Sequence, residues 1–366
     1  MFNIPKYTPP DFTIDMLANS PDAKIVEVDK DGVAPEYFHS TSMFPEYFKI
    51  DGNWVLCGDT RMDCVPVLND DGSLEAKEFR RLKKGDKVIT GREDDGSEGI
   101  YLYTEGFKAR QKAENDAFAF RSGRTRETSF ADDYHKLISM LEHDKDNGHI
   151  VWVLGPAAIF DRNSRQAMEY IIDNGYAHCV FGGNAVATHD LEGAMFNTAL
   201  GQDLDTHMNV HQGHYKHLDL LNRVQRSGSI KQAIEDHDLD NGLIYSCVKN
   251  DVPLVLAGSI RDDGPLPEVN SSSNTVQDEM RAHTKKATTI VCLASQLHTI
   301  ATGNLTPCYN VDKDGNVRPV FIFAADVSEF VLNKIRDRGT LEVTTIVSNI
   351  QDFLFKVRNL LENQNK

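Results

Sequence analysis

The chain has 366 residues, of which 40% are hydrophobic, and this size and composition indicate a soluble globular protein with two domains. Its formal net charge of -16 argues against nucleic acid and anionic membrane surfaces as partners, because both repel an acidic body. A cationic small molecule would instead be attracted.

Neither a leader-like amino terminus nor an apolar run of membrane-spanning length is present in the sequence, so we expect a cytoplasmic protein. The cysteines lack paired close spacing, which indicates reduced thiols and not disulfides or a structural zinc site; they are Cys57, Cys64, Cys179, Cys247, Cys292 and Cys308.

Residues 1–106 are expected to form a small β-rich domain. Residues 1–30 indicate only a packed arm or short strand, with a possible contact to a neighbouring subunit. Short β-prone runs separated by turns then predict an antiparallel sheet or barrel, at residues 47–50, 54–56, 65–68 and 87–90. Arg61 and Asp63 either face a cleft or form a salt bridge within this domain, and we favour the salt bridge.

Residues 107–148 are charge-rich and predict a linker followed by a helix from about residue 130. The basic residues here indicate a solvated face and not a phosphate site; they are Arg121, Arg124 and Arg126.

Residues 149–366 alternate strands, glycines and helices, which predicts an α/β fold with a doubly wound, mostly parallel, Rossmann-like sheet. The expected strands are residues 150–154, 178–181, 254–257, 289–293, 320–324 and 343–347. The expected helices are residues 164–174, 191–200, 277–285, 329–337 and 350–362.

The strand at residues 254–257 leads into a loop at residues 258–267 that carries Arg261, Asp262 and Asp263. In open α/β sheets ligands bind beyond the carboxyl ends of the strands, so this loop is a candidate site. A solvated turn with a local ion pair is the competing interpretation.

Glycine-bearing turns at strand ends permit close approach of a ligand to the backbone. We expect such turns to form a phosphate or nicotinamide cradle, with Gly155, Pro156, Gly182, Gly183, Asn184, Ala185, Gly303 and Asn304. Ordinary strand-to-helix turns are the alternative, since no Gly-x-Gly-x-x-Gly fingerprint is present. Asp326 follows a strand, where it can bind ribose hydroxyls or cap a helix.

Histidines and one lysine are further candidates. His189 and Asp190 are expected to open the helix at residues 191–200, with His189 as a proton carrier. Lys249 is an alternative base or a helix-terminal charge. A cluster in a predicted loop lacks a complete ligand set, so we expect no metal and favour a loop closing over substrate; its members are His207, His211, His214 and His217.

Motifs at residues 182–185, 188–190, 258–267 and 300–304 occur in one order, and with them the sequence from about residue 32 onward resembles the LOR/SDH-domain family. That family includes archaeal-type ornithine cyclodeaminases and the carboxyl-terminal half of a cyanobacterial bifunctional arginine-degrading enzyme. Family members often carry a further α/β segment ahead of this region, which is shortened or replaced here.

The resemblance implies a deoxyhypusine-synthase-like sheet that binds NAD without the fingerprint, and conversion of L-ornithine to L-proline and ammonia by internal hydride transfer with recycled NAD. We expect a homo-oligomer. The substrate carboxylate is assigned to Arg261, its terminal ammonium to Asp262 or Asp263, and the base to His189 or Lys249. Gly258 and Ser259 join the cofactor-binding turns.

Other interpretations remain open at this point. One is an opine- or saccharopine-type dehydrogenase or another NAD(P)-dependent amino-acid enzyme, in which free nicotinamide would turn over stoichiometrically. Others are a non-catalytic NAD-binding protein and a metal-dependent hydrolase built on the histidine cluster.

Overall fold

The structure is a computed structural model that describes residues 4–107, 129–262, 264–312, 314–336 and 342–364. Arg121, Arg124, Arg126 and Asp263 therefore lie outside the described residues. In the described part of the chain, no helix combines the length and apolar character needed to cross a membrane.

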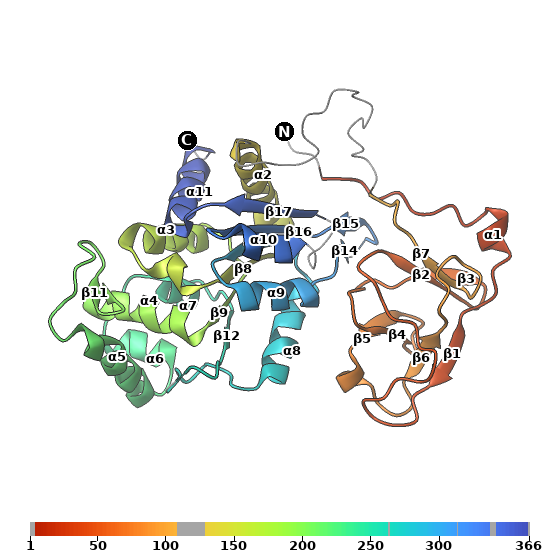
Figure 1. Ribbon diagram of the computed structural model, residues 1–366, viewed down its shortest axis with the longest axis horizontal. Coiled ribbons are helices and arrows are strands. Elements are labelled where there is room, and N and C mark those ends of the chain that lie inside the picture. The colour runs from red at the N-terminus through yellow and green to blue at the C-terminus, as the bar shows by residue number, and fades with distance from the viewer. Residues whose placement is uncertain (1–3, 108–128, 263, 313, 337–341, 365–366) are drawn as a thin grey trace.

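The N-terminal domain consists of two small antiparallel sheets, gathered at one side of the molecule (Figure 1). One has the order β1-β6-β4-β5, with β1 at Lys24–Glu27, β4 at Val65–Leu68, β5 at Leu74–Lys77 and β6 at Lys87–Thr90. The other has the order β3-β2-β7, with β2 at Glu46–Ile50, β3 at Asn53–Leu56 and β7 at Ile100–Leu102. A short helix α1 (Asp15–Ala18) and a 3-10 turn η1 (Phe79–Arg81) complete the domain.

The expected antiparallel pairing is confirmed, but three strands (β1, β5 and β7) go beyond the predicted runs. Strand β5 reads Leu-Glu-Ala-Lys, which local propensity does not favour as a strand. It forms because a turn at residues 69–73 returns the chain onto β4, in the register Leu68↔Leu74 to Val65↔Lys77. Arg61 pairs with Glu78 inside this domain, as expected.

The second domain is built on a six-stranded parallel sheet with the order β12-β9-β8-β13-β16-β17. Its strands are β8 (Ile150–Leu154), β9 (Cys179–Gly183), β12 (Leu254–Ala257), β13 (Thr289–Leu293), β16 (Phe321–Asp326) and β17 (Glu342–Val347). Numbered in chain order, the strands are arranged 3-2-1-4-5-6, the doubly wound arrangement. The strand order, and not the strand direction, reverses between β8 and β13. The predicted α/β, Rossmann-like fold is confirmed.

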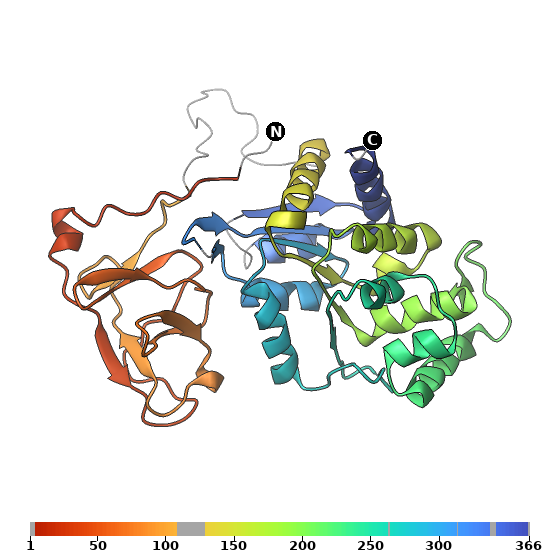
Figure 2. The same ribbon diagram turned by 180° about the vertical axis from the view of Figure 1, so that it is seen from behind.

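Helices cover both faces of this sheet (Figures 1 and 2). They are α2 (Ala131–Asn147), α3 (Arg162–Asp173), α4 (Asn184–Phe196), α5 (Gly213–Ser227), α6 (Ile230–Asp236), α7 (Leu243–Lys249), α8 (Ser273–Thr284), α9 (Gln296–Leu305), α10 (Glu329–Arg336) and α11 (Ile350–Gln364), with a 3-10 turn η2 at Pro156–Ile159. Two hairpins also occur, β10 (Thr198–Ala199) with β11 (Gln202–Asp203) and β14 (Tyr309–Val311) with β15 (Val317–Pro319).

The strand residues alternate between two separate cores. In β8, Ile150, Trp152 and Leu154 pack in the cluster that includes α2, α3, α7 and α11. Val151 and Val153 pack in the opposite cluster, with α8 and α10. Since successive side chains of a strand point to opposite faces, a run buried on both sides is hydrophobic throughout, which is why these strands were visible in the sequence.

The predicted start of the helix at residue 191 is wrong, because α4 begins at Asn184, directly after β9. His189 and Asp190 therefore lie inside the helix. Most of α4 is buried, so its sequence lacks the amphipathic period that marks a surface helix. Asp190 does cap a helix, but a different one: its carboxylate accepts the backbone N–H groups of Leu243 (3.1 Å) and Ile244 (2.8 Å) at the start of α7.

Buried polar contacts join the two domains. The carboxylate of Asp59 lies between Arg281 (3.3 Å) and Lys285 (2.9 Å) of the second domain. The hydroxyl of Thr60 contacts that of Tyr309, which is fully buried. A fully buried contact of this kind fixes the orientation of the domains more strongly than exposed ion pairs do.

The cysteines are all free and buried, which confirms the expectation of reduced thiols. Burial raises the pKa of Cys247 well above its usual value, so this thiol is a packed side chain and not an activated nucleophile.

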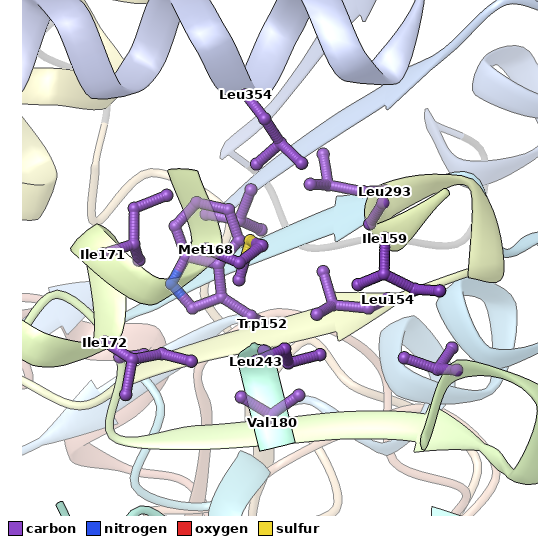
Figure 3. Close-up of a cluster of buried hydrophobic side chains, with 14 of the residues drawn as sticks. Trp152, Leu154, Ile159, Met168, Ile171, Ile172, Val180, Leu243, Leu293 and Leu354 are labelled. Atoms are coloured by element: carbon purple, nitrogen blue, oxygen red, sulfur yellow. The ribbon is translucent and has the colours of Figure 1, made fainter. Parts of the chain in front are cut away.

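Trp152 occupies the centre of the larger core, with Met168, Ile171 and Leu354 around it (Figure 3). It is fully buried, and its indole N–H donates to the carbonyl of Tyr176 at 2.8 Å. We predict that Trp152→Ala lowers the free energy of unfolding by about 3 to 5 kcal/mol, as expected for removal of a core aromatic. The measurement is chemical denaturation followed by circular dichroism.

The matched control is Phe355→Ala on α11, where the side chain is 51% exposed. That substitution should change stability by no more than about 0.5 kcal/mol. Equal losses in the two variants would contradict the placement of Trp152 in the core.

Candidate functional site

The carboxyl ends of β8 and β13 lie side by side where the strand order of the sheet reverses. Ligands of doubly wound folds bind in the crevice at this point. Gly155 follows β8 and lies against β13: its N–H donates to the carbonyl of Leu293 at 2.7 Å. A Cβ atom at Gly155 would lie 1.9 Å from the carbonyl oxygen of Ala294. Only glycine fits here, so Gly155 serves the close approach of two backbone segments at the floor of the crevice.

Two helices begin beside this floor, α4 after β9 and α9 after β13. Neither has a side-chain hydrogen bond at its N-cap residue, Gly183 for α4 and Ser295 for α9. The first N–H groups of an α-helix have no partner within the helix and favour anions. The two helix starts can therefore bind phosphate groups from either side of β8.

His298 lies in the first turn of α9 and was not among the residues predicted from the sequence. Its Nδ1 is 3.0 Å from the hydroxyl of Ser295, and a Cβ atom at Gly183 would lie 3.2 Å from its ring carbon. No described residue bonds its Nε2, and burial lowers the pKa of the ring. The signal in the sequence was Ser-x-x-His directly after a strand, which fixes one ring nitrogen and leaves the other for a ligand.

Asn184 has a structural use at the start of α4. It is 8% exposed, and its side-chain oxygen accepts the N–H of Leu266 at 3.0 Å, which ties the loop after β12 to α4. The other end of that loop is held by a bridge between Ala257 and Asn270. Gly258 lies close to this returning segment, since a Cβ there would be 3.0 Å from the Cα of Ser271.

The tip of the loop exposes Arg261. Its N–H donates to the hydroxyl of Ser259 at 3.2 Å, and its guanidinium forms no ion pair with a described residue. Asp262 accepts the N–H of Ser259 at 2.7 Å, so that carboxylate shapes the turn. The competing interpretation was a solvated turn with a local ion pair: Arg261 is exposed and does not pair with Asp262, and a pair with Asp263 lies outside the described residues.

Asp326 is the last residue of β16, at the same edge of the sheet. One carboxylate oxygen accepts the N–H of Ser328 at 2.8 Å, so the expected capping contact is present. No described residue bonds the second oxygen, which leaves it available for a ligand hydroxyl.

His189 lies behind the crevice, within α4. Its Nδ1 is 2.9 Å from Glu192, a fully buried carboxylate that also accepts from the hydroxyl of Thr198 (2.8 Å) and the N–H of Gly201 (3.2 Å). His217 of α5 lies beside it, with the ring centroids 6.4 Å apart. The pair His189 and Glu192 therefore joins α4 to the hairpin β10-β11.

The histidine cluster does not form one site. His214 and His217 lie on α5 as the spacing allowed, whereas His207 and His211 lie in the exposed segment before it. In the described residues, no group of three or more histidine, cysteine or acidic side chains is arranged to hold a metal ion.

Two assignments need correction. Gly303 and Asn304 lie in the last turn of α9 and not at a strand end. Lys249 ends α7 near the amino edge of the sheet, where it pairs with Asp173 at 3.2 Å. The remaining described candidates end a strand or follow its carboxyl end; they are Gly155, Pro156, Gly182, Gly183, Asn184, Ala185, Gly258, Ser259, Arg261, Asp262 and Asp326.

Two family descriptions match the chain. Residues 136–357 match the Rossmann-fold part of the arginine dihydrolase ArgZ-like C-terminal region, and residues 45–127 match its first region. A solved structure described as a conserved putative LOR/SDH protein from Methanococcus maripaludis superposes with a TM-score of 0.84 at 31% identity, covering 94% of this chain and all of that one.

Curated relatives include proteins named ornithine cyclodeaminase. The one from Methanopyrus kandleri is 36% identical, over 88% of this chain and 74% of its own. The bifunctional arginine dihydrolase/ornithine cyclodeaminase AgrE from Nostoc sp. is 32% identical, over 93% of this chain but only 47% of its own. A ternary complex of AgrE with ornithine and NAD+ has a TM-score of 0.59 at 31% identity, covering 94% of this chain and 46% of that one.

The Rossmann-fold match alone spans more than half of the chain, and the Methanopyrus relative is similar over most of both sequences. The resemblance seen in the sequence is thereby confirmed, and this chain belongs to the family of the ArgZ-like C-terminal region and the archaeal ornithine cyclodeaminases.

Proposed function

We propose that the protein is an NAD-dependent ornithine cyclodeaminase that converts L-ornithine to L-proline and ammonia. The observation that carries this proposal is the switch point between β8 and β13, where Gly155 touches the carbonyl of Ala294 and two helices start nearby without side-chain caps. Such a site accepts a dinucleotide pyrophosphate despite the net charge of -16, because the donors are local. The relatives named for this activity supply the substrate.

The position of Asp326 suggests how the cofactor lies. In the order 3-2-1-4-5-6 the two halves of the sheet are related by a pseudo-twofold axis, and the usual ribose-binding acid ends the second strand. Here that strand, β9, ends at Gly183. Asp326 ends β16, the equivalent strand of the other half. We therefore place the adenosine ribose at Asp326, the pyrophosphate at the start of α9 and the nicotinamide over β9 and β12.

This orientation brings the substrate to the loop after β12. Arg261 presents a guanidinium that no described residue pairs, as a substrate carboxylate requires. One carboxylate oxygen of Asp262 accepts the N–H of Ser259 in the turn, which leaves the other oxygen for the terminal ammonium of the substrate. Asp263 remains a candidate for that ammonium but lies outside the described residues.

Bound NAD would accept a hydride from the α-carbon of ornithine and return it to the cyclic imine. The chain must move protons: the α-ammonium loses one before oxidation and the δ-ammonium loses one before its nitrogen attacks the α-imine. One proton then goes to the departing ammonia and one to the ring nitrogen of proline. His298, neutral because burial lowers its pKa, can take the α-ammonium proton on Nε2 and supply the one for the departing ammonia. Ornithinium then yields proline and ammonium with no net proton change. His189 is the alternative carrier, farther from the crevice.

The expectations of a cytoplasmic location and a homo-oligomer belong to the same proposal. The free, buried cysteines suit a reducing compartment. Large apolar side chains exposed on α5, Tyr215 and Leu218, offer surface for a second subunit.

The first test is the stoichiometry of the reaction. With L-ornithine and substoichiometric NAD+, the purified protein should release proline and ammonia in equal amounts over many turnovers, without accumulation of reduced-nicotinamide absorbance. Mass spectrometry identifies the product. Stoichiometric NADH would instead identify an amino-acid dehydrogenase of the opine or saccharopine type.

Arg261→Lys should reduce kcat/KM for ornithine by roughly 10-fold or more, because lysine cannot form the bidentate contact and a hydrogen bond to a charged group contributes about 1.5 to 3 kcal/mol. NAD+ affinity should stay nearly unchanged, as should the melting temperature, since this guanidinium holds no described residue. Unaltered turnover would remove Arg261 from the proposed site.

His298→Asn should lower kcat by about 100-fold or more if His298 moves the protons. In the wild-type protein kcat/KM should rise with pH, because the base must be neutral, and the acid limb should lie below about pH 6.5 since the pKa of His298 is lowered. His189→Asn, at the other candidate, is the matched comparison. A larger loss in that variant would transfer the role to His189.

A further inference from the structure

Helix α9 spans the distance between the domain interface and the proposed cofactor crevice. Its first residues follow β13 at the crevice, and near its last residue the carbonyl of Asn304 accepts a hydrogen bond from Arg61 of the N-terminal domain. A helix of this length extends about 15 Å and moves as a rigid body. A displacement at one end of α9 is therefore transmitted to the other end.

The final carbonyl groups of α9 are bound by charged side chains. Arg61 donates from Nη1 to the carbonyl of Asn304 at 3.0 Å, and Arg281 donates from Nη1 to that of Leu305 at 2.6 Å. The hydroxyl of Thr284 also donates to Leu305 at 3.0 Å. The last carbonyls of a helix have no partner within it and carry partial negative charge, so these cations fix the end of α9 in place.

Of these three side chains, Arg61 alone comes from the N-terminal domain. It is 6% exposed, and its guanidinium is held there by the carboxylate of Glu78 and by the carbonyl of Met62 at 3.3 Å. Its Nε is buried without a hydrogen-bond partner among the described residues. A buried unpaired donor is unfavourable, so stability alone gives no reason for this group. The guanidinium fork, however, reaches Glu78 and Asn304 at once.

At its other end α9 forms part of the crevice. The carbonyl of Ala294, just before the helix, fills the space that a side chain at Gly155 would need. His298 in the first turn lies against Gly183. These two contacts place the first turn of α9 directly against Gly155 and Gly183, so a shift of the helix changes how this turn lies against the ends of β8 and β9.

We infer that Arg61 is a positioning residue for the cofactor: from the N-terminal domain it holds the carboxyl end of α9, and thereby sets the first turn of α9 at the distance from Gly155 and Gly183 that NAD requires. The inference rests on the proposed function, because it needs NAD to bind in this crevice. Under this inference, the N-terminal domain contributes to NAD binding without contacting the cofactor.

The test measures NAD+ binding directly, by titration calorimetry on the full chain, for Arg61→Lys and Arg61→Met. Both should bind NAD+ roughly 5- to 150-fold more weakly than the wild-type protein, the range usual for coupling between sites. Lysine should retain more affinity than methionine, because its single ammonium can still reach one partner. The KM for NAD+ should rise more than kcat falls at saturating NAD+.

Two further variants separate positioning from general weakening of the interface. Arg80→Ala removes an exposed ion pair with Asp278 (2.7 Å) that joins the same two domains without touching α9, and its NAD+ affinity should equal that of the wild-type protein. Glu78→Gln keeps Arg61 but loosens its support, and it should weaken NAD+ binding by less than Arg61→Met.

The outcomes are distinguishable. Wild-type NAD+ affinity in folded Arg61 variants, with only a lower melting temperature, overturns the inference and leaves the proposed function standing. An equal loss in Arg80→Ala overturns it as well. Absence of NAD+ binding by the wild-type protein removes the proposed function and the inference together. If Arg61→Met fails to fold, Arg61→Lys and Glu78→Gln carry the same expectation.

Discussion

The close approach of the chain after β8 to the chain after β13 is the constraint on which the rest of the second domain depends. With a Cβ position only 1.9 Å from the carbonyl oxygen of Ala294, Gly155 allows two backbone segments to touch where the strand order of the sheet reverses. The strands on either side then lead into helices that diverge, α4 on one side and α9 on the other. Any side chain at Gly155 would clash with the backbone of Ala294, beside the point where both helices start.

The strands of the second domain could be predicted because burial on both faces produces continuous hydrophobic runs. Residues 150–154, 254–257 and 289–293 match β8, β12 and β13 at both ends. Helix α4 was harder, since a buried helix has no polar face and its start left no periodic signal. Gly303 was misplaced because glycine marks turns on average, whereas here it lies within a helix whose end is capped by arginines distant in sequence.

The sequence indicated where the candidate site lies in the fold, but it did not indicate the role of each side chain. The turns at Gly155 and Gly182, the loop with Arg261 and the acid Asp326 all follow strand ends, as the α/β rule requires. The uses of Asn184 and Asp190, however, depend on partners at Leu266 and Leu243, which no local pattern reveals. His298 was missed because no helix was predicted at residues 296–305, so no histidine was expected in a first helical turn after β13.

These contacts explain why a family member can lack the dinucleotide fingerprint. The buried polar side chains around the crevice face inward: Asn184 holds the loop after β12, Asp190 caps α7 and Glu192 holds the hairpin. In the proposed mode of binding, the pyrophosphate is therefore left mainly to backbone donors at the start of α9. Backbone donors need no particular side chain, so the motif can change while the geometry persists. In the proposed mode of binding, the position of α9 is what must be preserved, and Arg61 and Arg281 bind its far end.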